Sequence, residues 1–67
     1  MMIDEIGKNA GLIWKILDKQ NEIRQSELAK LSKLAKPDFL LALGWLARES
    51  KIALYETDKE PMVLLIY

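Results

Sequence analysis

Residues 26–49 decide how this chain folds, and they read SELAKLSKLAKPDFLLALGWLARE. Ser26 is a favourable N-cap, and the apolar spacing after it predicts a helix that fades at residues 32–33. Pro37 suits the first turn of a further helix, which we expect over residues 38–49. This segment therefore predicts two helices joined by a short turn.

The residues before this segment predict another helix and a very short strand. An apolar stripe at helical spacing predicts an amphipathic helix over residues 4–18; the stripe consists of Ile3, Ile6, Ala10, Ile13, Trp14 and Leu17. Gly7 and Gly11 lie beside the stripe although glycine disfavours a helix by about 1 kcal/mol relative to alanine. We expect these glycines to let another helix approach closely. Residues 23–25 are expected to form the short strand.

The residues after the segment predict a hairpin. Residues 52–57 alternate like a strand, residues 58–61 form a turn, and residues 62–67 form a second strand. Helix, short strand, helix, turn, helix and hairpin is the order of a winged helix-turn-helix domain. We predict a mainly α domain of the α+β class over residues 1–67, with three helices and a wing of two or three strands.

Two segments resemble a known family. Residues 6–14 and 41–49 are similar to segments of small stand-alone winged helix-turn-helix proteins found in prokaryotes, and the second segment is the more specific. The resemblance covers nearly the whole chain and implies a winged-helix fold with no established activity. Lys33 departs from the pattern, because many turns of this type carry glycine there.

Composition excludes several classes of function. The 67 residues contain no cysteine and no histidine, and ten acidic residues balance ten basic ones. Thiolate nucleophiles, zinc–thiolate sites and the commonest general base are therefore absent. The sequence predicts no catalytic, cofactor-binding or metal-binding residue, and thus no enzyme. No apolar run reaches the ~20 residues of a membrane span. The N-terminal residues include Asp4 and Glu5 and do not have the pattern of a signal peptide. We therefore expect a cytoplasmic protein without membrane contact.

The third predicted helix has an unusual outer surface. One side of this helix should pack inward; it carries Phe39, Leu43, Leu46 and Ser50. The opposite side carries Leu41, Gly44, Trp45 and Arg48, with Leu40 at its edge. A helix that reads DNA bases should present polar side chains there. Either Trp45 and Leu40 fold down onto the first helix or the wing, or this side is buried against another protein chain. We favour the second interpretation, with a second copy of the chain as the simplest partner.

The last predicted strand is apolar on both faces, whereas a wing has only one face to bury. Its second face is expected either to cover Leu12 and Ile16 of the first helix or to contact a partner. An uncovered apolar edge strand would promote aggregation, so something should cover it.

DNA binding is the alternative function. Residues 24–51 hold six basic and three acidic residues, a local net charge of +3, and the rest of the chain carries −3. Candidate phosphate contacts are Arg24, Lys30, Lys33 and Lys36. The wing tip at residues 58–61 has one net negative charge and would repel phosphate.

We therefore predict a non-enzymatic interaction module that forms a homodimer, accessory to transcription, with another protein partner or DNA as alternatives.

Overall fold

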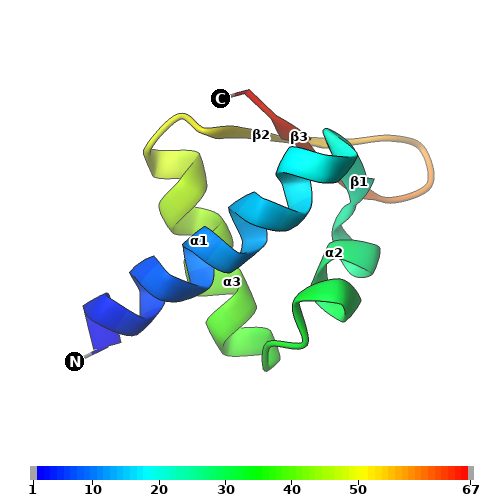
Figure 1. Ribbon diagram of the computed structural model, residues 1–67. Coiled ribbons are helices and arrows are strands. Elements are labelled where there is room, and N and C mark those ends of the chain that lie inside the picture. The colour runs from blue at the N-terminus through cyan, green and yellow to red at the C-terminus, as the bar shows by residue number, and fades with distance from the viewer. Residues whose placement is uncertain (1, 67) are drawn as a thin grey trace.

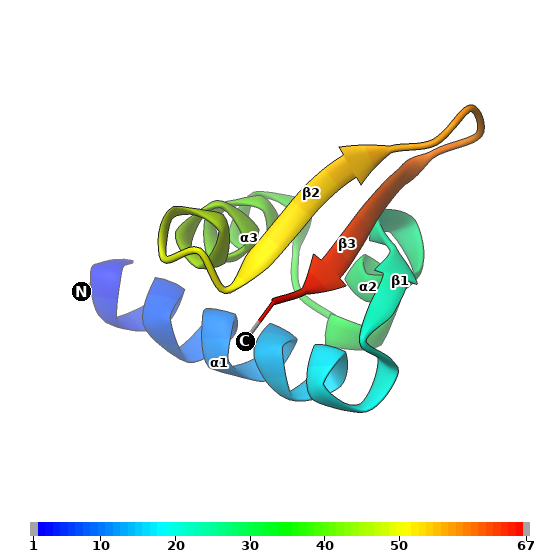
Figure 2. The same cartoon turned by 90° about the horizontal axis from the view of Figure 1, so that it is seen from above.

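Three helices and three short strands follow one another along residues 2–66, the part of the chain that the computed structural model describes. The order is α1 (Met2–Gln20), β1 (Glu22–Arg24), α2 (Gln25–Ser32), α3 (Lys36–Arg48), β2 (Ile52–Glu56) and β3 (Pro61–Leu65). The helices pack together on one side of the sheet, and the β2–β3 hairpin projects beyond them (Figures 1 and 2). The predicted strand residue Tyr67 lies outside the described residues.

One hydrophobic core joins all six elements. Its buried residues include Ile13 and Leu17 of α1, Leu28 of α2 and Val63 of β3, which are almost inaccessible to solvent. Their positions in α1 follow the predicted stripe, but Ile3 does not, because 56% of its surface is exposed. The first turn of α1 extends beyond α3 and has no element to pack against (Figures 1 and 2).

The turn between α2 and α3 depends on a buried hydroxyl group. Ser32 donates a hydrogen bond from Oγ to the Ala29 carbonyl (2.8 Å) and accepts one from the Leu34 N–H (3.2 Å). Lys33 adopts a left-handed conformation, with φ 60°, at the position where glycine is common. The helix-turn-helix therefore forms without the glycine, and the lysine side chain is exposed.

Ser26 is not the N-cap of α2, contrary to the prediction. The helix begins at Gln25 directly after β1, and Arg24 occupies the cap position without a capping side-chain hydrogen bond. The Ser26 hydroxyl instead donates to the Glu60 carboxylate, with Oγ and Oε1 3.4 Å apart. The Ser26 hydroxyl thus binds a wing residue 34 positions away instead of a backbone N–H group of its own helix.

Two expectations for the helices are wrong. Ser50 does not join the buried side of α3, because the helix ends at Arg48 and Ser50 lies in an exposed left-handed turn. Gly7 and Gly11 do not serve close helix packing either: a Cβ built at each would meet no atom within 4 Å. Buried side chains such as Ala10 and Leu46 make the α1–α3 contact instead, and both glycines remain exposed.

The sheet corrects the prediction for the last strand. β3 lies in the centre in the order β1-β3-β2, paired antiparallel with both neighbours, so it is not an edge strand. Val63 pairs with Ile23 of β1 and Leu54 of β2, and its side chain is buried on the face that meets the core. Leu64 lies on the opposite, outward face. The outward face of β3 does not cover Leu12 and Ile16, because the helices lie on the other side of the sheet (Figure 2). Leu12 and Ile16 instead lie near Leu31 of α2.

Candidate protein-interaction site

The outer face of α3 consists of Leu40, Leu41, Gly44, Trp45 and Arg48, and all five residues are exposed. Its position follows from helical geometry, because Phe39, Ala42, Leu43 and Leu46 are buried on the other side of the helix. Leu41 keeps 45% of its surface in contact with solvent, and Trp45 keeps 37%. The helix that would read bases in a DNA-binding domain of this type thus presents an apolar surface.

Leu40 and Trp45 contact neighbouring elements only in part. Leu40 borders a groove of about 410 Å³ between α2, α3 and the start of β3, which also includes Ala29 and Pro61. Trp45 borders a second groove, between α3 and α1. Both side chains remain exposed despite these neighbours, so the domain's own fold leaves much of the outer face uncovered.

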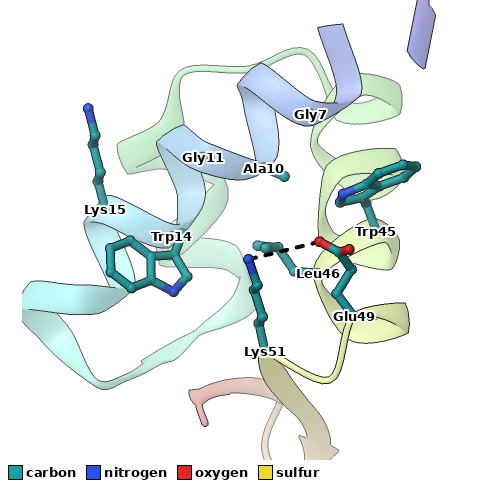
Figure 3. Close-up of a pocket in the computed structure, with 9 residues that line it drawn as sticks. All are labelled: Gly7, Ala10, Gly11, Trp14, Lys15, Trp45, Leu46, Glu49 and Lys51. Atoms are coloured by element: carbon teal, nitrogen blue, oxygen red, sulfur yellow. Dashed lines mark ion pairs between the residues drawn. The ribbon is translucent and has the colours of Figure 1, made fainter. Parts of the chain in front are cut away.

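The α1–α3 groove has a volume of about 400 Å³. Trp14 stands on the α1 side and Trp45 on the α3 side, while Gly7 and Gly11 leave the surface of α1 open between them (Figure 3). Lys51 crosses the lower end, where its Nζ lies 3.9 Å from Glu49 Oε1. Lys15 also borders the groove, so its surface is apolar between the two tryptophans and charged at its margins.

The polar inventory of α3 is small. Within Lys36–Arg48 the only polar side chains belong to Lys36, Asp38 and Arg48, and they stand at the two ends of the helix. Direct readout of base edges relies on Arg, Lys, Asn, Gln, Ser or Thr side chains along the inserted helix. The middle of α3 carries none, so this surface does not offer a pattern of donors and acceptors to a base pair.

The predicted phosphate-binding residues do not form one group. Lys30, Lys33 and Lys36 are exposed around the turn between α2 and α3, and none makes an ion pair within the described residues. Arg24 lies at the other end of α2, where Nη2 is 3.0 Å from Glu27 and Nη1 is 3.6 Å from Glu60. The hydrogen bond to Glu27 and the charge of Glu60 raise the pKa of Arg24. Its charge is therefore already compensated by two carboxylates.

Two residues of these surfaces were not predicted. Glu60 binds both Arg24 and Ser26 and thereby ties the wing to α2; no local pattern could indicate a contact across so many residues. Asp38 is exposed in the first turn of α3, three residues before Leu41. Its spacing from Leu41, Trp45 and Arg48 was visible in the sequence and indicates a shared side of the helix.

The described residues show neither a membrane span nor a metal site. Even the 19-residue helix α1 lacks the apolar length that crossing a bilayer requires. Within residues 2–66, no three His, Cys, Asp or Glu side chains are placed to hold a metal ion.

The fold and this surface define a winged helix-turn-helix domain, a class of DNA-binding and protein-interaction modules that is typically non-enzymatic. More narrowly, residues 1–65 match the winged helix-turn-helix domain family DUF2582, and the chain belongs to that family. It is similar to the solution NMR structure of protein BT2368 from Bacteroides thetaiotaomicron, with 32% identity and a TM-score of 0.86. The similarity covers 97% of this chain and 79% of that chain. No curated protein matches the chain. The predicted fold and family resemblance are confirmed.

Proposed function

We propose that this protein is a non-enzymatic interaction module that forms a homodimer through the outer face of α3. The observation that carries the proposal is the exposure of Leu40, Leu41 and Trp45 on the helix where a DNA-reading domain needs polar side chains. Tryptophan and arginine are enriched at the centres of protein interfaces, and Trp45 and Arg48 are one helical turn apart. A cytoplasmic, accessory role in transcription is inferred by analogy with the winged-helix class.

Energetics support self-association. Full burial of a large apolar side chain contributes roughly 1.5–3 kcal/mol, so completing the burial of three half-exposed side chains contributes roughly 2–4 kcal/mol per protomer. A domain of 67 residues has only a small core, and a partner adds stability that the core alone rarely supplies. Burial of the apolar outer face therefore stabilises a dimer, whereas in an isolated protomer the face stays in water and contributes no such stabilisation.

The test is the association state of the wild type beside Leu41→Glu, measured by sedimentation, with circular dichroism to confirm folding. Leu31→Glu is a matched control, because Leu31 is 46% exposed on α2 and lies outside the outer face of α3. We expect the wild type and Leu31→Glu to be dimers and Leu41→Glu to be a folded monomer. A monomeric wild type, or dimers in all three samples, would contradict the proposal.

DNA binding through the three lysines is the second candidate, favoured by their exposure around one turn without acidic partners in the described residues. Contact with phosphates alone would be blind to sequence and would weaken steeply with salt. Titration of a labelled duplex at 50 and 200 mM salt tests this candidate, where phosphate-dominated binding loses roughly tenfold or more. Absence of binding at the lower concentration rejects it.

A further inference from the structure

A stripe of four exposed residues runs along α3: Asp38, Leu41, Trp45 and Arg48. The spacings of three, four and three residues keep all four on one side of the helix, as in a two-helix seam. The stripe has an acid at one end, two large apolar residues in the middle and a base at the other end. When two such stripes run in opposite directions, the acid of each therefore faces the base of the other.

We propose that two copies of the chain pair their α3 helices antiparallel about a two-fold axis that passes midway between Leu41 and Trp45 on the outer face, which sets the register of the dimer. This inference rests on the proposed function and specifies its geometry. In that register Leu41 packs against the partner's Trp45, and Asp38 faces the partner's Arg48. The two-fold axis repeats both contacts, so four apolar side chains form the centre and an ion pair closes each end.

Charge selects this direction over the parallel one. Asp38 and Arg48 are ten residues apart, about 15 Å along the helix axis, and neither makes an ion pair within the described residues. A parallel pair would place Asp38 beside the partner's Asp38 and Arg48 beside the partner's Arg48. The antiparallel pair replaces both repulsions with attractions and also sets the two helix dipoles in opposite directions.

The backbone leaves room for this approach. Gly44 lies next to the stripe, and a Cβ built there would meet no atom of its own protomer within 4 Å. Small residues at a helix crossing allow the two backbones to approach closely, which increases contact between the flanking side chains. The open α1–α3 groove provides further apolar surface beside each Trp45 (Figure 3).

Charge reversal tests the register with the full chain. Asp38→Arg places two arginines opposite each other at both ends of the homodimer, and Arg48→Asp places two aspartates there. We expect either substitution to raise the dimer dissociation constant by about tenfold or more, because attraction is replaced by repulsion at two symmetric positions. An equimolar mixture of the two variants restores both ion pairs in a heterodimer. We expect its dissociation constant to lie within about threefold of the wild-type value.

Sedimentation at 0.15 M salt measures these constants, since that ionic strength screens attraction between exposed charges beyond about 8 Å. Lys36→Glu is the control, because it has the same net charge as Arg48→Asp and lies on α3 outside the stripe; it should retain the wild-type constant. If the mixture associates no better than either variant alone, the register is wrong, even where Leu41→Glu abolishes the dimer and the proposed function stands. A monomeric wild type overturns both.

Discussion

The outer face of α3 and the contact between Arg24 and the wing differ in how their charges are paired. In the β2–β3 turn of the wing, Glu60 lies beside Arg24, which is also paired with Glu27, so the charge of Arg24 is compensated within the protomer. On α3, Asp38 and Arg48 stand at opposite ends of an apolar surface and make no ion pair in the described part of the chain. The charge of Arg24 is therefore paired within one protomer, whereas in our proposal the charges at the two ends of the α3 surface are paired by a partner.

Trp45→Ala should have the largest effect on this comparison. Removing the largest side chain of the outer face should raise the dimer dissociation constant by about thirtyfold or more, which corresponds to the ~2 kcal/mol of an interface hot spot. Tyr55→Ala is the matched control, since Tyr55 is an aromatic residue of β2 with 38% exposure against 37% for Trp45. Sedimentation of both variants measures the difference. Equal weakening by the two substitutions would place the interface elsewhere or extend it to the sheet.

Glu60→Lys alters the other surface. The substitution removes one of the two carboxylates that hold Arg24 and adds a positive charge beside it. We expect roughly tenfold tighter, salt-dependent binding to a duplex at low salt, because each additional phosphate contact steepens the salt dependence by about 0.9. Asp58→Lys makes the same change of charge in the same turn and should give the smaller gain, since Asp58 makes no ion pair with Arg24. An equal gain in fluorescence anisotropy titrations would show that Glu60 does not restrain Arg24.

Gly44→Ala should have the smallest effect, and one of mixed sign. Alanine favours a helix over glycine by about 1 kcal/mol, and a Cβ at this position meets no atom within the protomer. The free energy of unfolding measured in urea at low protein concentration should therefore increase. The dimer should weaken at the same time, because the added methyl group separates the two helices. Gly11→Ala should give a similar gain in stability with a smaller change in association; a stronger dimer for Gly44→Ala would contradict close packing there.

The helices were predictable because their signals are local. Apolar residues at helical spacing indicated α1 and α3, Pro37 marked the start of α3, and the exposed side of α3 followed from the same periodicity. The sequence alone therefore specifies which residues form the outer face of α3. The position of the three lysines around the turn followed in the same way.

Other features could not be predicted because their causes lie far apart in the chain. Ser26 looked like an N-cap, but Glu60 of the wing binds its hydroxyl group. Gly7 and Gly11 suggested close helix packing, but both lie on the exposed side of α1, and α1 contacts α3 through buried side chains. Ile3 continued the apolar stripe, yet α1 extends past the elements that could cover it.

The sequence by itself determined the helix-turn-helix, the hairpin and the apolar character of α3, since each depends on neighbouring residues and helical or strand periodicity. Only the tertiary structure decided that β3 occupies the centre of the sheet, because β1 pairs with it across about 40 residues of chain, at a separation where no sequence period operates. Tertiary structure likewise compensated Arg24 and left Asp38 and Arg48 without a partner in the described residues. Charge pairing depends on distance in space, which the order of residues does not specify.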